Sequence, residues 1–280
     1  MNISASAVKA LRDRTNQPMM DCKAALTQAD GDEEKAVEIL RKKSKDVQDK
    51  KVGRETAEGR IAAYIDPAQG VGAMVEMRCE SAPVAKGDDF ARLSNDIAKQ
   101  VALKAPETIE ALLAHPFVDD PKRTVNDRIA EVVGIIKEHM KPARMVRLTG
   151  LLGSYIHHDS SIGVMVQAEG SKANAQLLGE ISMHITALNP AAIRREDISA
   201  EKLAKEKEIA KSQAASTGKP ANIVDMIAEG KMKTWFAENV LLEQPFVKDL
   251  SKNPKTVGDL LKAAGLNLVK FVRFEVGELS

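Results

Sequence analysis

Cysteine, histidine and carboxylate side chains are the residues of this 280-residue chain that could do covalent or metal chemistry. Cys79 with His157 as its base would make a nucleophilic pair, since such a pair needs only contact in the folded chain. His157, His158 and Asp159 offer the nitrogen and oxygen ligands that many metal ions accept. Each group also has a purely structural interpretation. Cys79 would be a small residue near a strand end, and His157, His158 and Asp159 would be polar residues in a turn. We favour the structural interpretation, so we predict no metal site and no cofactor.

Two glycine-containing segments match nucleotide-binding motifs only in part. Gly218-Lys219 resembles the end of a phosphate-binding loop, but Pro220 replaces the required Ser or Thr and no strand precedes it. Gly70-Val71-Gly72 lacks the third glycine of a dinucleotide motif and leads into a strand instead of a helix. The sequence therefore offers few residues arranged for enzyme catalysis.

The segment RCESAPVAKGD, residues 78–88, follows an expected strand and precedes an expected helix. Loops at such positions often carry function. Pro83 could equally do no more than stiffen a crossover between the two elements. Both interpretations stay open from the residues alone.

Composition excludes several classes of protein. The chain is 44% hydrophobic and 29% charged, which is typical of a globular protein. Its 41 basic and 40 acidic residues give a net charge of +1, and only nine residues are aromatic. A nucleic-acid-binding role is therefore disfavoured, because it needs a basic surface and stacking platforms. Two cysteines and the lack of a long apolar run predict a soluble, cytoplasmic protein with no membrane span.

Residues 4–44 read as three short helices, with Pro18 opening the second and Asp32 capping the third. A unit of about 40 residues has too small a core for much stability, so we expect it to be marginal or docked on a partner. The charged residues 41–60 that follow predict a helix extension or a linker.

A hairpin followed by a helix is predicted twice along the chain. The first copy has a hairpin over residues 60–79, turning at Pro67 and Gly70, and a helix that stops before Pro106. Shifts of 91 residues for the hairpin and 84 for the helix end align it with a second copy, Pro106 falling on Pro190. We favour duplication over chance similarity between two amphipathic hairpins, which gives two α+β subdomains.

The remaining segments predict helices and a closing strand. Residues 124–147 read as a helix, and MVRLTGLLGSY after it enters the first strand of the second copy. A helix from Ser199, a break at Thr217-Gly218-Lys219-Pro220 and a second helix predict a hairpin that projects into solvent or against another protein. The tail LVKFVRFEVGELS returns to strand alternation.

Several segments, spread over nearly the whole chain, carry a family resemblance: VKALRDRTNQPMMDCKAAL, GSYIHHDSSIGVMV, SMHITALNP, STGKP, ENVLLEQPFVKD, KTVGDLL and FVRFEVGE. Together they resemble bacterial elongation factor Ts, the family of guanine-nucleotide exchange factors for elongation factor Tu. The resemblance implies an α+β fold with a three-helix ubiquitin-associated-like domain, two duplicated α+β core subdomains and an inserted helical hairpin. The domains we expect are 1–53 (three helices), 54–148 (first core subdomain), 149–198 with 231–280 (second core subdomain) and 199–230 (hairpin).

The resemblance also implies which residues meet the partner. The segment Ser81-Ala82-Pro83-Val84 matches a family segment, usually Thr-Asp-Phe-Val, that is implicated in disturbing the magnesium site of the partner GTPase. An acid and an aromatic residue are thus replaced here by Ala82 and Pro83. The further partner-binding residues that the resemblance implies are Val8, Leu11, Arg12, Met19, Met20 and His157. Many family members continue past FEVGE into a C-terminal helical module, whose contact we expect to be missing because the sequence ends at Ser280.

The resemblance predicts a protein that acts by binding and is not an enzyme. It would bind elongation factor Tu in its GDP-bound and nucleotide-free forms and exchange GDP for GTP. One alternative is a binding partner or chaperone of elongation factor Tu that does not promote exchange, which the altered 81–84 segment favours. Another is an enzyme using Cys79 and His157, and a third is a ribosome- or RNA-binding role. The 199–230 hairpin is the candidate element for a homodimer, although a monomer also fits.

Overall fold

The computed structural model describes residues 3–170, 174–216 and 218–278, and it has the expected α+β fold. Its N-terminal module consists of helices α1 (Ala5–Thr15), α2 (Met19–Gln28) and α3 (Glu33–Asp49). Ser4 caps α1 by accepting from the Ala7 N–H, and Asp32 caps α3 by accepting from the Lys35 N–H. The charged residues after Leu40 extend α3 as far as Asp49 before a short connection begins.

The three-helix module packs on helix α7 (Val125–Ile136) of the same chain. Three polar residues of the module, Gln17, Ser44 and Gln48, are buried there. Helices α3 and α7 approach so closely that a Cβ on Gly134 would lie 2.3 Å from the Ser44 Oγ. The module thus buries additional surface against its own chain. This packing compensates for the small core expected of a unit of its size.

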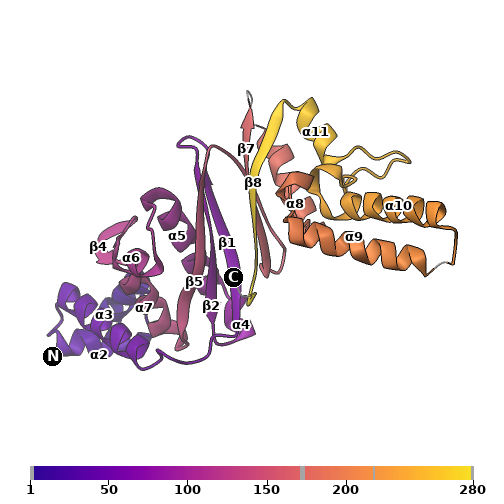
Figure 1. Ribbon diagram of the computed structural model, residues 1–280. Coiled ribbons are helices and arrows are strands. Elements are labelled where there is room, and N and C mark those ends of the chain that lie inside the picture. The colour runs from indigo at the N-terminus through magenta and orange to yellow at the C-terminus, as the bar shows by residue number, and fades with distance from the viewer. Residues whose placement is uncertain (1–2, 171–173, 217, 279–280) are drawn as a thin grey trace.

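The first core sheet contains β1 (Glu58–Asp66), β2 (Val71–Cys79) and β5 (Met140–Thr149), antiparallel in the order β1-β2-β5. The predicted hairpin is confirmed, with Gly70 at φ 60° in its turn. Helix α5 (Asp88–Lys104) covers the outer face of the sheet (Figure 1). The smaller elements of this half are α4 (Ala82–Ala85), α6 (Ile109–Ala114), β3 (Pro116–Phe117) and β4 (Asp120–Thr124).

The second core sheet repeats this topology with β6 (Leu151–Ile156), β7 (Ile162–Gly170) and β8 (Leu266–Glu275), in the order β6-β7-β8. Helix α8 (Ala175–Leu188) covers its outer face. The β-bulges of the two sheets, at Glu76/Met77 and Gln167/Ala168, are 91 residues apart. Helices α5 and α8 both end in a left-handed residue before a proline, Ala105 and Asn189, 84 residues apart. Both shifts seen in the sequence therefore have a structural counterpart.

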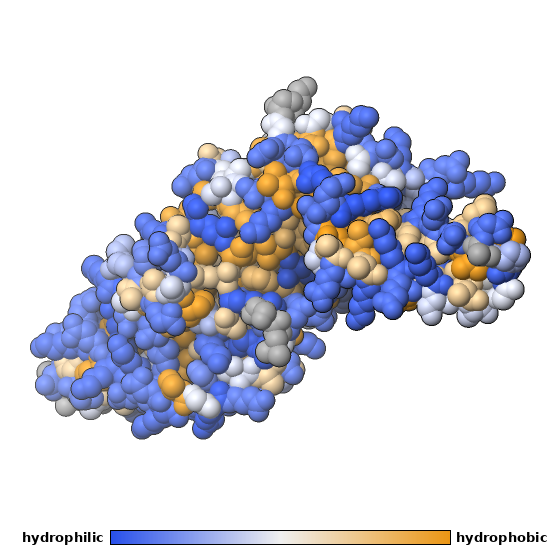
Figure 2. Space-filling model, viewed as in Figure 1, coloured by the Kyte–Doolittle hydropathy of each residue, from blue (hydrophilic) through white to orange (hydrophobic). Residues whose placement is uncertain are grey.

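The two sheets pack face to face, which gives the core four layers: helix, sheet, sheet and helix (Figure 1). Along β7, Val164 and Val166 point toward α8, whereas Met165 points toward the first sheet, as strand alternation requires. Gly163 allows the close approach, because a Cβ there would lie 2.5 Å from Ile61 Cγ2. Figure 2 shows apolar side chains gathered over the sheets, while the visible face of the three-helix module is mostly hydrophilic.

Two expected elements have different bounds in the structure. The helix predicted over 124–147 ends at Ile136, because Lys137 adopts φ 65° and β5 begins at Met140. MVRLTGLLGSY is not one strand, since Gly150 at φ 101° turns the chain between β5 and β6. The strand β5 therefore closes the first sheet, where the sequence predicted a helix.

The predicted helical hairpin consists of α9 (Ala200–Ala215) and α10 (Ala221–Asn239), and it projects from the second core sheet (Figure 1). Its second helix continues past residue 230 to Asn239, and Thr217 of the predicted break lies outside the described residues. The hairpin exposes three apolar side chains, Ile209, Ile223 and Met226. Self-association through this hairpin stays a prediction. The remaining elements are η1 (Arg195–Asp197), η2 (Leu241–Glu243) and α11 (Val257–Ala263). None of the helices in the described part of the chain combines the length and apolar character of a membrane span.

A buried carboxylate connects the two sheets at one end of their interface. Glu76, 2% exposed, accepts from Arg78 Nη1 at 2.9 Å and from Arg144 Nε at 2.5 Å. It also accepts from the backbone N–H of Gly277, just after β8, at 3.0 Å. Arg144 in turn donates to the Glu275 carbonyl at 2.6 Å. One side chain of the first sheet thus anchors the last strand of the second.

We expect Glu76→Gln to destabilise the protein by about 3–5 kcal/mol, because it leaves two guanidinium groups facing a neutral side chain in a buried site. Urea denaturation gives the free energy of unfolding. Glu58→Gln, an exposed acid in β1, is the matched control and should change it by less than about 0.5 kcal/mol. Equal stabilities of the two variants would contradict the role given to Glu76.

His184 of α8 is fully buried and holds the chain that follows η2. Its Nδ1 accepts from the Val247 N–H at 3.2 Å, so its Nε2 carries the proton and donates to Gln244 Oε1 at 2.9 Å. The Gln244 amide is oriented by donating to the Glu238 carbonyl at 2.6 Å. Burial lowers the pKa of His184, and the Gln244 hydrogen bond opposes this only in part.

Because the folded protein holds His184 neutral, the unfolded chain takes up its proton first as the pH falls. This contribution to stability is complete above a pH of about 6.5, the pKa of an unperturbed histidine, and is lost as the pH falls below it toward the lower folded pKa. We expect the free energy of unfolding to fall by up to about 1.4 kcal/mol per pH unit there. His184→Gln should remove that slope, whereas His158→Gln, at an exposed histidine, should retain it. Identical slopes in urea titrations of all three proteins at pH 7.5, 6.5 and 5.5 would refute the assignment.

Candidate functional site

The segment Ser81-Ala82-Pro83-Val84 forms the short helix α4 and its N-cap directly after β2. Its proline lies within the first helical turn, where the missing N–H costs no hydrogen bond. Pro83 is exposed, and the other three residues are partly buried. The segment is therefore a rigid turn at one end of the first sheet and not an extended loop.

Two carboxylates fasten the start of this segment to the end of α7. Glu138 accepts from the Ser81 N–H at 3.1 Å and from the Ser81 Oγ at 2.6 Å. Glu80 accepts from the His139 N–H at 2.6 Å, and this bond, aided by Arg54, lowers the pKa of Glu80. Glu80 and Glu138 were not predicted, because nothing in the sequence indicates that residues 80–81 lie beside residues 138–139.

His157 begins the turn between β6 and β7. Its N–H donates to the Ile162 carbonyl at 2.9 Å, and its carbonyl accepts from the Ser160 N–H at 2.8 Å. The imidazole ring is partly exposed and packs edge-on against His158, with 4.3 Å between ring centroids. The backbone of the turn thus fixes a histidine at the surface.

The residues named as metal ligands or as a nucleophile have other partners in the structure. Asp159 Oδ1 accepts from both the N–H and the Oγ of Ser161, which lowers its pKa. No group of three or more His, Cys, Asp or Glu side chains within residues 3–170, 174–216 and 218–278 is arranged to hold a metal ion. Cys79 is fully buried, its Sγ donates to the Ser81 carbonyl at 3.4 Å, and burial raises its pKa to about 12. A thiol with that pKa is not a nucleophile at neutral pH.

The 81–84 segment and the His157 turn come from different halves of the duplicated core, and the fold places them at the same end of the two sheets (Figure 1). The Ile61 N–H, on the free edge of β1, donates to the Ser160 carbonyl at 2.7 Å. Arg60 donates to the carbonyl of Ala85, the residue that follows the 81–84 segment and ends α4, and to the Ser160 Oγ of the His157 turn. The structure therefore brings together two elements that the sequence separates by about 75 residues.

The predicted N-terminal residues divide into a buried and an exposed set. Val8 is 6% exposed and Leu11 is 0% exposed, because both lie in the core of the three-helix module. The module itself covers both side chains, so a partner contact through these two residues stays a prediction. Arg12 is exposed, and Met19 and Met20 are 50% and 72% exposed, so these three side chains are available at the surface.

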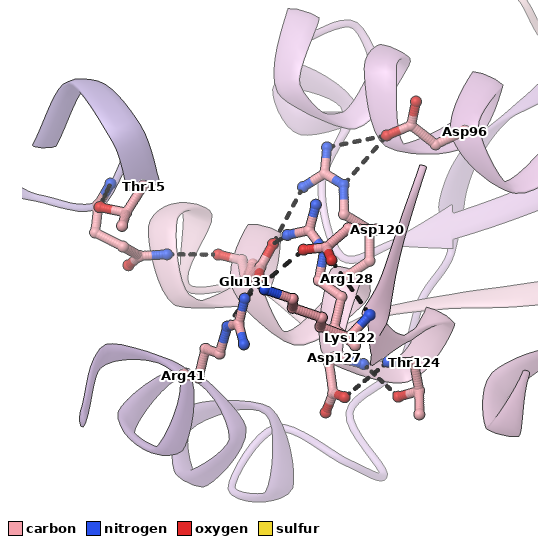
Figure 3. Close-up of polar contacts among 11 residues, drawn as sticks. Thr15, Arg41, Asp96, Asp120, Lys122, Thr124, Asp127, Arg128 and Glu131 are labelled. Atoms are coloured by element: carbon pink, nitrogen blue, oxygen red, sulfur yellow. Dashed lines mark hydrogen bonds and ion pairs between the residues drawn. The ribbon is translucent and has the colours of Figure 1, made fainter. Parts of the chain in front are cut away.

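Charged side chains hold the module on the first core subdomain (Figure 3). Glu131 of α7 is the centre of this network: its carboxylate pairs with Arg123, and its backbone carbonyl accepts from Gln17 Nε2 at 3.1 Å. Arg41 of α3 lies 3.9 Å from Glu131 and 3.8 Å from Asp120. These contacts border a polar cleft of about 410 Å³ between the module and the core.

The module and the α4 end of the core are also joined more directly. Asn16, the C-cap of α1, donates to Asp89 Oδ1 at 3.5 Å. Asp89 is in the first turn of α5, which follows α4 after a break of two residues. The exposed residues of α1 and α2 are thus carried by a module whose position is tied to that of the 81–84 segment.

Fold and site together define an α+β protein whose candidate site is a set of anchored surface segments. A family model described as elongation factor TS matches residues 80–278. Elongation factor Ts of Methylococcus capsulatus is 43% identical over 281 residues, covering 99% of this chain and 93% of that protein. Elongation factor Ts of Aquifex aeolicus is 39% identical over 291 residues, covering 100% and 99%. The chain therefore belongs to the elongation factor Ts family of translation elongation factors, as its motifs indicated.

The division of the N-terminal residues predicts opposite effects of truncation. We expect Leu11→Ala to destabilise the protein by about 2–5 kcal/mol, because it leaves a cavity in a small core. Met20→Ala should change the free energy of unfolding by less than about 0.5 kcal/mol, since its side chain already faces solvent. Denaturant titration followed by far-UV circular dichroism measures both. A loss for Met20→Ala as large as that for Leu11→Ala would contradict this division.

Proposed function

We propose that this chain binds elongation factor Tu in its GDP-bound form and promotes release of GDP and its exchange for GTP. Family membership supports the partner, and one observation of the fold carries the site. That observation is the placement of the 81–84 segment beside the His157 turn, from two halves of the core, at one exposed end of the sheets. A surface built in this way can press on one partner domain at two neighbouring points.

Exchange of this kind follows from binding linkage and needs no proton transfer. A GTPase holds GDP partly through Mg²⁺ and a phosphate cradle. A factor that binds more tightly when that cradle is disturbed must weaken GDP binding, and GDP must weaken binding of the factor by the same ratio. In our proposal the 81–84 segment and His157 disturb the Mg²⁺ and phosphate site, while Arg12, Met19 and Met20 add affinity from the three-helix module.

A second candidate function rests on the composition of the 81–84 segment. Ala82 and Pro83 offer shape and stiffness but no acceptor for a hydrogen bond from the partner and no aromatic ring to insert. A protein with these residues could bind elongation factor Tu without accelerating GDP release, as a partner or chaperone. The two functions differ in whether this protein raises the rate of GDP release from elongation factor Tu.

Release of a fluorescent GDP analogue from elongation factor Tu of the same organism, in excess unlabelled GDP and Mg²⁺, distinguishes them. Exchange predicts a release rate that rises with the concentration of this protein and saturates. His157→Ala should raise the half-saturating concentration about tenfold, while His115→Ala, at a histidine remote from the site, should leave it unchanged. Pro83→Phe tests whether a ring at this position speeds release further. Unchanged release together with co-elution of the two proteins on a sizing column would select the non-exchanging partner.

A further inference from the structure

Arg60, near the start of β1, connects the two segments of the proposed site. Its Nη1 donates to the carbonyl of Ala85, the last residue of α4, at 3.4 Å. Its Nη2 donates to the Ser160 Oγ in the β6–β7 turn at 3.0 Å. The planar guanidinium presents its donors in a fixed fork, so both bonds hold only while α4 and the turn keep one relative position.

The backbone around Ser160 transmits this position to His157. Ser160 adopts φ 61°, its N–H donates to the His157 carbonyl at 2.8 Å, and its carbonyl accepts from the Ile61 N–H at 2.7 Å. Ser160 is therefore held through its side chain by Arg60 and through its backbone by the next residue of the same strand. Movement of the turn away from β1 would break both the Ile61–Ser160 and the Arg60–Ser160 hydrogen bonds.

The charge of Arg60 is not matched by a carboxylate. Within the described residues no acidic side chain forms an ion pair with Arg60, and its buried Nε has no hydrogen-bond partner. Asp159, in the same turn, is instead bound by Ser161. Burial lowers the pKa of Arg60, yet a guanidinium stays protonated at neutral pH. A charged donor is thus partly buried where it binds two neutral oxygens, one in each functional segment.

We infer that Arg60 is a positioning residue, which holds the 81–84 segment and the His157 turn as one rigid surface toward the partner GTPase. This role rests on the proposed function, because rigidity matters there for distorting the partner's nucleotide site. Two segments that move independently can still touch the partner, but they relax instead of transmitting strain to it. Loss of Arg60 should therefore lower the saturating rate of GDP release more than it weakens binding.

Arg60→Met tests this inference, since it keeps a long side chain and removes every donor. We expect the saturating release rate to fall about tenfold and the half-saturating concentration to rise less than about threefold. Arg60→Lys keeps the charge but not the fork, and it should resemble Arg60→Met. Arg147→Met is the matched control, because Arg147 also donates from the first sheet to a backbone carbonyl, that of Ala102, away from the site; its release kinetics should equal those of the unaltered protein.

Ser160→Gly completes a double-mutant cycle, because glycine accepts the positive φ of this position while the hydroxyl is lost. If Arg60 acts through Ser160, the double variant should release GDP no more slowly than Arg60→Met alone. Full additivity of the two losses would show that they act separately and would overturn the bridging role.

Hydrogen–deuterium exchange of the free protein separates failure of this inference from failure of the proposed function. We expect Arg60→Met, but not Arg147→Met, to speed amide exchange at least about fivefold in both 84–87 and 157–162. Unchanged exchange in both segments overturns the inference whatever the GDP assay gives. If amide hydrogen exchange rises as expected but the unaltered protein does not accelerate GDP release, the coupling of the two segments through Arg60 stands and the proposed function fails. Acceleration by the unaltered protein and by Arg60→Met at equal rates overturns the role in exchange.

Discussion

The structure depends on the face-to-face packing of two sheets whose relative position is fixed at one end by the Glu76 carboxylate. Apolar side chains such as Met74 and Met165 fill the interface, but apolar contact alone tolerates sliding. Glu76 adds direction, because it binds Arg78 and Arg144 of its own sheet and the Gly277 N–H beyond β8. The candidate site lies at this same end of the sheets, so its two segments have a defined separation only if the sheets do.

The sequence predicted elements whose signals are local. The first hairpin turns at Gly70 as expected, and the repeat is visible because a bulge and a helix end recur at equivalent positions. Strand β5 was not predicted, because Pro142 and the basic residues between its apolar positions obscure the alternation, and its pairing partner β2 is far away in sequence. The apolar stripe of Val8 and Leu11 was visible, but a stripe does not say whether its own domain or another protein covers it.

The residues that position the site could not be predicted from the sequence, because their roles also depend on contacts between distant segments. Ser81 could be recognised as part of a motif. Glu138 binds Ser81 only because the chain after α7 passes beside Ser81 in the folded protein. Arg60 reads as an ordinary strand residue until the β6–β7 turn is placed against the edge of β1. Such residues act through tertiary contacts, so they carry no periodic or motif signal. Glu80, Glu138 and Arg60 each bind a backbone group near the site, which suits a surface that acts by shape.

The replacement of an acid and a ring by Ala82 and Pro83 then has a physical consequence for how such a surface could act. Without an aromatic wedge at these positions, the 81–84 segment would act on a partner mainly through the backbone shape of α4, and a backbone shape exerts force only if it does not yield. Helix α4 is fixed by Glu138 through its N-cap Ser81, by a proline within its first turn and by Arg60 at the carbonyl of its last residue, Ala85. A short helix restrained at three points can transmit strain that a flexible loop of the same composition would absorb. Stiffness from the surrounding residues would thus replace the missing side chains in the proposed exchange.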